Sequence, residues 1–462
     1  MGMTQTLFDK LWNSHRVKSL DNGQDLIAID RVFLHERTGS VALQSLLDAG
    51  YAPRFPSRVF CTMDHIVSTH SARGKDSSRT PDGDVFITAT RQAAKTAGIN
   101  LIDVLDADQG IVHVISPELG IVQPGLTLVC PDSHTCSQGA LGALAWGIGS
   151  TDAEHAMATG CLRVKKPPQM RIEITGRLRD GITAKDLALH IIKTLGAAGA
   201  KRCAVEYCGS AVRALSVEQR LTLCNMAVEF AAFTAIIAPD DKVATYLNGR
   251  KYAPDDAAWE TAQTYWNSLC SDADAVYDYV HTLDASDVAP TVTWGTNPAQ
   301  AIALSDHVPA KSDENAKALD YMGLTGEQHL TDLTISGAFI GSCTNARLSD
   351  LRAAASVLDG KHIARGVTAI CVPGSMSVRR AAEAEGLDEI FKTAGFEWGA
   401  AGCAFCFYAG GETFAPGSRV ISSTNRNFEG RQGPGVRTHL ASPAIVAASA
   451  ITGKIAAPET TS

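Results

Sequence analysis

The order of apolar and polar residues predicts strand–loop units in the first third of the chain. Three stretches run from apolar, β-rich sequence into a polar loop: "VFCTMDHIV" (59–67), "GIVHVI" (110–115) and "LTLVCPDSHT" (126–135). The next stretch, "SQGALGALAWGIGSTDAEHAMATG" (137–160), has small and apolar residues at helical spacing and predicts a closely packed helix.

The middle of the chain opens with an alternating strand, "QMRIEITGRL" (169–178). The stretch "TAKDLALHIIKTLG" (183–196) then predicts an amphipathic helix with Thr183 as its N-cap. The acidic, aromatic sequence from Asp255 to Tyr279 is typical of a surface helix.

Beyond about residue 330 a strand–turn–helix pattern occurs three times and favours a parallel α/β sheet. The three units are "GAFIGSCTNARLSDLRAAASVL" (337–358), "GVTAICVPGSMSVRRAAEAEGL" (366–387) and "RVISSTNRNFEGRQG" (419–433). Cys343, Ser375 and Arg426 each come just after a predicted strand. Ligand crevices of open α/β sheets form at such strand ends, so these positions are candidates for a site.

Composition narrows the class of protein. The 462 residues predict more than one domain, and 45% hydrophobic with 19% charged residues is typical of a soluble protein. A net charge of −8 argues against a nucleic-acid binder. The N-terminus does not resemble a signal peptide, and no apolar run reaches the length of a membrane span. Twelve cysteines then indicate reduced thiols or metal ligands in a cytoplasmic protein.

The pair Cys403 and Cys406 has the Cys-x-x-Cys spacing, which occurs in redox couples, zinc sites and iron–sulfur sites. A redox couple would be expected at a helix start near the beginning of a chain, whereas Cys403 and Cys406 lie in the C-terminal third. A structural zinc site normally has a second close pair, and here the nearest other ligand is the distant His439. Cys343 in "GSCTN" offers a third thiol at a strand end. Three thiolates would leave one iron of a cubane cluster open to act as a Lewis acid.

Six motifs along the chain resemble the aconitase superfamily, and most closely its isopropylmalate dehydratase large subunits. The motifs are "TMDHIVST", "PDSHT", "TLCNMAVE", "FIGSCTNARLSDLRAAA", "GCAFC" and "NRNFEGRQG". The resemblance implies a 4Fe-4S cluster held by Cys343, Cys403 and Cys406. It also implies three α/β/α domains around the cluster, expected at residues 1–168, 169–305 and 306–462, without a C-terminal swivelling domain.

The resemblance assigns roles to further residues. Asp64 and His65 match the pair that protonates the departing hydroxyl group. His113, Asp132 and His134 match a hydrogen-bonded set around the substrate. The remaining matches are Asn225 and Glu229 near the cluster, and Arg426 and Arg431 as carboxylate-binding arginines.

The resemblance also implies a partner and a substrate class. A separate small subunit is expected to supply the swivelling domain and the catalytic base. We expect interconversion of 2- and 3-isopropylmalate, a step of leucine biosynthesis. The sequence from Phe407 to Glu412 departs from that family, so a paralogue that hydrates citraconate or maleate is the alternative. A non-catalytic binding protein with this fold is a third reading, which the acidic net charge and the three thiols disfavour.

Overall fold

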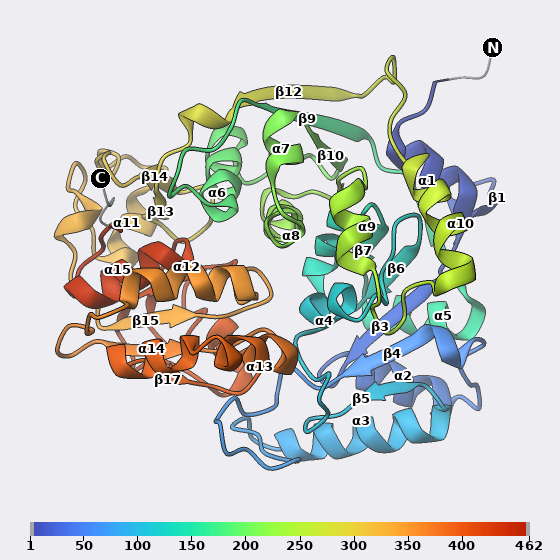
Figure 1. The fold of residues 1–462 in the computed structure, drawn as a ribbon, viewed down its shortest axis with the longest axis horizontal. Helices are drawn as coiled ribbons and strands as arrows, with labels where there is room; N and C mark the ends of the chain where they lie inside the picture. The colour runs from blue at the N-terminus through green and yellow to red at the C-terminus, as the bar shows by residue number, and fades with distance from the viewer. Residues whose placement is uncertain (1–3, 459–462) are drawn as a thin grey trace.

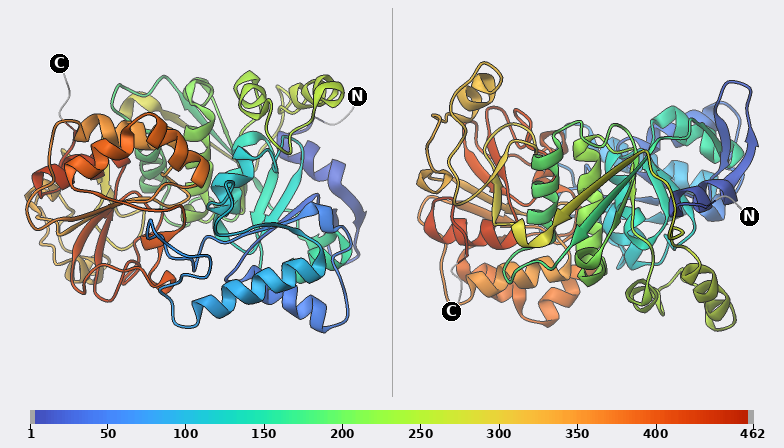
Figure 2. Two further views of the ribbon diagram at one scale, coloured as in Figure 1. Left: turned by 60° about the horizontal axis from the view of Figure 1, so that its bottom comes forward. Right: turned by 90° about the horizontal axis from the view of Figure 1, so that it is seen from above.

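The computed structural model describes residues 4–458, which form three large β-sheets, each from a different stretch of the chain. Figure 1 shows these stretches in blue to cyan, green to yellow, and orange to red. In both views of Figure 2 the green middle stretch lies between the other two. Among the described residues, no helix has the length and apolar character needed to cross a membrane.

The first sheet has five parallel strands in the order β5-β4-β3-β6-β7. Its strand β4 is buried along its whole length, as expected for a parallel strand covered on both faces. The elements are β3 (Arg31–His35), α2 (Gly39–Asp48), β4 (Val59–Thr62), α3 (Gly83–Ala97), β5 (Asn100–Ile102), α4 (Val112–Glu118), β6 (Thr127–Cys130), η2 (Ser133–Leu141), β7 (Leu144–Gly147) and α5 (Ser150–Thr159). Helix α1 (Leu7–His15) and an antiparallel sheet of β1 (Arg16–Ser19), β2 (Asp25–Ala28) and β8 (Cys161–Val164) lie beside it.

The second sheet has four parallel strands in the order β11-β10-β9-β12. Burial alternates along β9, and Thr183 caps α6 in a capping box with Asp186, so both sequence predictions are confirmed. The elements are β9 (Gln169–Thr175), α6 (Ala184–Leu195), β10 (Ala204–Cys208), α7 (Ser210–Ala214), α8 (Val217–Asn225), η3 (Met226–Phe230), β11 (Thr234–Ile236), α9 (Asp241–Leu247), α10 (Asp256–Asn267) and β12 (Tyr279–Asp284).

The third sheet is also parallel, in the order β17-β16-β15-β18-β19. The elements are β13 (Thr291–Thr293), β14 (Ala301–Ala303), α11 (Ala316–Met322), β15 (Gly337–Ile340), α12 (Leu348–Leu358), β16 (Thr368–Cys371), α13 (Met376–Ala384), α14 (Leu387–Ala394), β17 (Glu397–Trp398), η6 (Ala404–Cys406), β18 (Arg419–Ser422), β19 (Arg437–Leu440) and α15 (Pro443–Thr452). The hairpin β13–β14 packs with this sheet's core through Val292 and Ile302. The domain divisions at residues 168 and 305 stay predictions.

Four predictions of local structure were wrong, wholly or in part. The stretch 110–115 is not a strand, because α4 begins at Val112, and a short apolar run buried on all sides has no readable period. The stretch 137–160 is not one helix but η2, β7 and α5, interrupted at Gly142, whose φ is 80°. Strand β18 leads through a loop to β19 instead of into a helix, and the surface helix α10 ends at Asn267.

Candidate active site

All three sheets change strand order at a comparable place, and the candidate site lies at two of these switch points. Strands β3 and β6 are neighbours although β4 and β5 separate them in the chain, and the pairs β9 with β12 and β15 with β18 are related in the same way. Ligand crevices form beyond the carboxyl ends of strands at such switch points. Here His35 ends β3 and Asp132 follows β6 closely, whereas Cys343 and Arg426 follow β15 and β18.

One cavity of about 220 Å³ joins the loops of both switch points. It is lined by His35, Arg37, Thr38, His65, Ile111, His113, Pro131, Asp132, Ser133, His134, Cys343, Cys403, Cys406, Phe407, Arg426 and Arg431. Three of the predicted site residues lie just behind this lining. Asp64 contacts His65, Asn225 contacts Cys343, and Glu229 contacts His134. The structure therefore gathers the whole predicted set around one space.

The three predicted cluster cysteines are buried and form no disulfide. Cys343 follows β15, Cys403 directly precedes the single turn of η6, and Cys406 is the last residue of that turn. The side-chain amides of Asn225 and Asn425 donate to Cys343 Sγ at 3.2 and 3.5 Å. Three soft sulfur donors around one cavity, with amide donors behind them, fit an iron–sulfur cluster.

Burial disfavours ionisation of two of these thiols. It raises the pKa of Cys343 to about 12, and the adjacent Cys406 acts in the same direction. It also raises the pKa of Cys403 well above the ordinary value. Binding of a metal cation would favour the thiolate forms of both.

Two residues that the sequence suggested as candidates for a ligand or a site have structural roles instead. His439 lies in β19, where its Nδ1 contacts the Thr293 carbonyl at 2.7 Å and its Nε2 contacts Arg419 at 2.9 Å. It does not line the cavity, so it does not complete a zinc site with the thiols. Ser375 caps α13, because its hydroxyl accepts from the Val378 N–H at 3.0 Å.

The loop that carries Cys403 and Cys406 is tied to the N-terminal segment just after it leaves the cavity. The buried Glu412 carboxylate accepts hydrogen bonds from the backbone N–H and the hydroxyl of Thr69. The preceding Gly411 has a φ of 84°, and a Cβ there would lie 2.4 Å from the carbonyl carbon of Arg79. A glycine is therefore needed for both conformation and space.

Replacing Gly411 by alanine is expected to lower the free energy of unfolding by about 3–5 kcal/mol and to weaken iron retention. The reason is a backbone clash added to an unfavourable φ. Gly417 is a matched control, because its φ is 78° and a Cβ at this position would have nothing within 4 Å. Its alanine variant should lose only about 1–2 kcal/mol in urea denaturation. Equal losses at the two positions would contradict the close approach to Arg79.

A chain of hydrogen bonds links the two carboxylates on the first sheet's side of the cavity. His65 Nδ1 contacts Asp64 Oδ1 at 2.6 Å, and His65 Nε2 contacts Asp132 Oδ2 at 3.2 Å. The buried Glu36 carboxylate accepts the backbone N–H groups of Asp64 and His65 at 3.0 and 2.7 Å. His35 stacks on the His65 ring with centroids 3.9 Å apart. The His65 ring is thus held on both edges and one face.

The chain continues from Asp132 to the third sheet. Asp132 Oδ1 accepts from His113 Nε2 at 2.9 Å and from the His134 backbone N–H at 2.7 Å. His134 Nε2 contacts Glu229 Oε1 at 2.7 Å, and Arg426 Nε donates to both oxygens of Glu229 at 2.8 and 3.1 Å. The Arg426 charge is therefore already matched by a carboxylate of the protein.

The imidazole and carboxylate charges stabilise one another. Burial alone would lower the pKa of His65, but Asp64 and the other groups around it raise that pKa well above its ordinary value. Burial likewise opposes ionisation of Asp132, and His113 outweighs it, so the pKa of Asp132 is well below the ordinary value. Burial and the nearby His65 lower the pKa of His35 to about 4. The charged form of His65 is thus favoured, and that of His35 is disfavoured.

Several residues around the cavity were not predicted from the sequence. His35 ends β3 and Arg37 follows it, and the sequence marks them only as polar residues at a strand end. Asn425 precedes a predicted arginine and contacts the Cys343 thiol. Lys185 is fully buried in α6 and donates to the Ser423 carbonyl at 2.9 Å, which holds the loop before Asn425. No local pattern distinguishes such a lysine from a solvated one.

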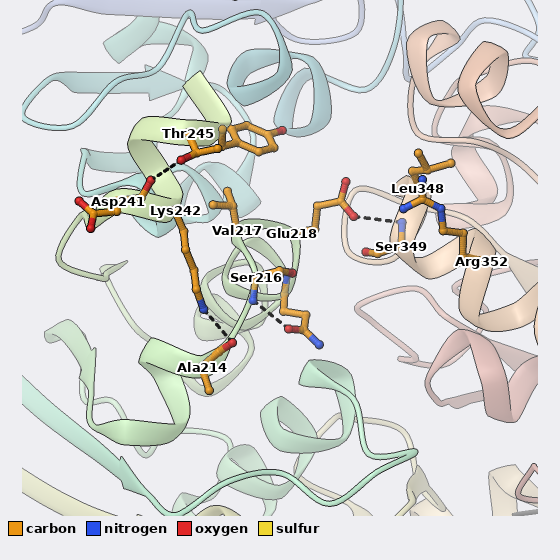
Figure 3. Close-up of a pocket in the computed structure, with 12 residues that line it drawn as sticks. Ala214, Ser216, Val217, Glu218, Asp241, Lys242, Thr245, Leu348, Ser349 and Arg352 are labelled. Carbon is orange, nitrogen blue, oxygen red and sulfur yellow. Dashed lines mark hydrogen bonds between the residues drawn. The ribbon is translucent and has the colours of Figure 1, made fainter. Parts of the chain in front are cut away.

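A larger cavity, of about 680 Å³, lies between α8, α9 and the start of α12 (Figure 3). Its polar groups are engaged with the protein: Glu218 accepts from the Ser349 N–H at 3.0 Å, and Lys242 donates to the Ala214 carbonyl at 2.9 Å. It contains neither cysteine nor histidine. We therefore place the candidate chemistry in the smaller cavity.

Comparison with known proteins identifies a family and a similar solved structure. The chain is similar to the solved structure of aconitase X from Thermococcus kodakaraensis in its holo-form. The two sequences are 14% identical, and the TM-score is 0.44. The match covers 87% of this chain and 84% of that one. Residues 9–453 match the aconitase family, described as aconitate hydratase. The chain belongs to the aconitase family.

Proposed function

We propose that this chain is the cluster-bearing subunit of a hydro-lyase that removes and adds water at a hydroxy-diacid, with 2- and 3-isopropylmalate as the first candidates. The observation that carries the proposal is the convergence of three thiols, a charged imidazole and arginines on one cavity. Dehydration needs an acid for the departing hydroxide, a base for the carbon-bound proton and cations for the carboxylates. The acid and the cations are among the residues described above, and the base is not.

A 4Fe-4S cluster held by Cys343, Cys403 and Cys406 would supply a Lewis-acidic iron for the substrate hydroxyl and carboxylate. His65 holds a proton on Nε2, shared with Asp132, and Asp64 orients the ring through Nδ1. This proton is placed to pass to the leaving oxygen. The cationic fork of Arg431 faces the same cavity and suits a carboxylate.

A small partner subunit completes the proposal by supplying the swivelling domain and the catalytic base. The resemblance to dehydratase large subunits supports this. A second support is that Asp132 is already held by His65, His113 and His134, and so is a poor acceptor for a carbon-bound proton.

Phe407 favours a second candidate function, hydration of a smaller diacid such as citraconate or maleate. Its ring lines the cavity, lies edge-on to His65 with centroids 5.7 Å apart, and is 7% exposed. A fixed aromatic ring leaves less space for a branched substituent. Each methylene changes selectivity in an apolar pocket by about 1–3 kcal/mol, so the ring can alter the ranking of related diacids.

The test is kcat/KM of the reconstituted chain and small subunit, measured anaerobically with isopropylmalate, citraconate and maleate. Isopropylmalate turnover above the others supports the first candidate, and a hundredfold preference for citraconate or maleate supports the second. The isolated large chain should turn over none of them. If none is hydrated by the iron-loaded pair, the hydro-lyase proposal fails.

Removal of iron gives a separate prediction. An iron without a protein thiolate is the one most easily lost on oxidation, so exposure to air is expected to abolish activity. Ferrous iron and a thiol reductant should then restore it, together with the broad visible absorption of the cluster. Full activity after prolonged aeration would exclude an open-iron mechanism.

A further inference from the structure

Three arginines face the cavity, and they differ in what balances their charge. Arg426 is paired with both oxygens of Glu229. Within residues 4–458, no carboxylate forms an ion pair with Arg37 or Arg431. Arg431 contacts Cys406 Sγ at 3.8 Å through Nη2, and its buried Nε has no partner. Two guanidinium groups of this cavity are therefore free to bind an anion.

The ring of Phe407 brings the two unpaired arginines together. The guanidinium carbon of Arg37 lies 4.6 Å from the ring centroid, and that of Arg431 lies 5.4 Å from it. Cation–π contact stabilises each group in place but neutralises neither. Burial lowers the pKa of Arg37 and the charge of Arg431 lowers it further, whereas Glu36, which forms no ion pair with Arg37, acts in the opposite direction. Two neighbouring like charges without an ion-paired carboxylate are typical of an anion site.

We propose that Arg37 is a substrate-binding residue, which holds the carboxylate farther from the thiols while Arg431 holds the nearer one. Arg431 is the arginine in contact with Cys406, whereas Arg37 is exposed at the mouth of the cavity. Phe407 is then the platform that sets the spacing of the two guanidinium groups. This inference rests on the proposed function, because it takes a diacid as the ligand. It assigns Arg426 to orienting Glu229 and His134 instead of to a substrate carboxylate.

The test compares Arg37→Gln and Arg37→Lys with the wild type in the iron-loaded complex with the small subunit. Arg37→Gln should raise KM for the preferred diacid about 10–100-fold and change kcat less than threefold. The KM of Arg37→Lys should lie between those of the wild type and Arg37→Gln, since lysine keeps the charge but lacks the planar guanidinium group with its paired N–H donors. Arg58→Gln is the matched control, because its guanidinium also lies on an aromatic ring, 4.8 Å from the centroid of Phe55, outside the cavity.

Calorimetric titration with succinate, a diacid without a hydroxyl group, gives a readout that needs no turnover. In Arg37→Gln, the affinity for succinate should fall by the same factor by which KM rises. Inhibition by acetate should not change, because acetate has one carboxylate and lacks the one assigned to Arg37. An unchanged KM and succinate affinity would overturn the role of Arg37 and leave the hydro-lyase proposal standing. Loss of co-elution with the small subunit in Arg37→Gln would also overturn it, by making Arg37 a docking residue. If no diacid is hydrated but succinate binding depends on Arg37, the hydro-lyase proposal fails and the anion site remains.

Discussion

Serine in place of any one of Cys343, Cys403 and Cys406 is expected to reduce hydratase activity below detection and to lower the iron content of the anaerobically purified protein. The three sulfurs line one cavity and, as described, have no other protein thiol to replace them there. A serine hydroxyl is a hard, weakly acidic donor and a poor substitute for a thiolate on iron. Iron and sulfide analysis, with the visible spectrum, measures the loss directly.

Two other cysteines serve as controls for this series. Cys270 is exposed, and its serine variant should keep wild-type iron content and activity. Cys371 is buried at the end of β16, near a strand end like the cluster cysteines, but it is absent from the cavity lining. Its alanine variant is expected to be less stable than the wild type but to keep the wild-type iron content. Equal iron loss at Cys270 or Cys371 would refute the assignment of the three ligands.

Replacing Asp132 by asparagine is expected to lower kcat by about 10²–10⁴-fold while the cluster spectrum persists. The carboxylate accepts from His65, His113 and the His134 backbone at once. An amide of the same shape removes the charge and turns one acceptor into a donor. Without the Asp132 carboxylate, the proton on His65 Nε2 is neither stabilised by a negative charge nor held in a fixed direction.

Asp152 provides the matched control for this substitution. It is exposed on α5 and lines a neighbouring groove but not the cavity, so Asp152→Asn should leave kcat unchanged. A loss of iron in Asp132→Asn would show a structural effect on the ligands, and unchanged kcat would remove Asp132 from the reaction. Anaerobic steady-state kinetics and the visible spectrum separate these results.

The residues that the resemblance assigned to the site lie at one cavity or directly behind its lining, whereas four of the predicted elements differ from those observed. Strand-end loops are recognisable because apolar runs stop abruptly near polar residues, as before Asp132 and after Ile340. Helix α4 was missed because its apolar residues are buried on every side, so neither a helical nor a strand period can be read. Strand order is also unreadable in one sequence, and without it the two switch points cannot be placed.

The least predictable features are contacts between distant parts of the chain. Arg37 follows β3 and Phe407 follows η6, and only the packing of the first segment against the third brings the guanidinium onto the ring. The pairing of Arg426 with Glu229 has the same origin. A motif names the residue that carries a charge, whereas the structure shows whether another residue has already neutralised it.

The placement of the thiols also bears on how the protein matures. Cys343, Cys403 and Cys406 all come from loops of the last sheet, whereas His65 and Asp132 come from the first. Segments leave the ribosome in chain order and fold largely as units, so His65 and Asp132 are made before any of the three thiols. Loading of the proposed 4Fe-4S cluster would consequently be a late step of biogenesis. It must also reach sulfurs that, in the finished fold, are less than 8% exposed.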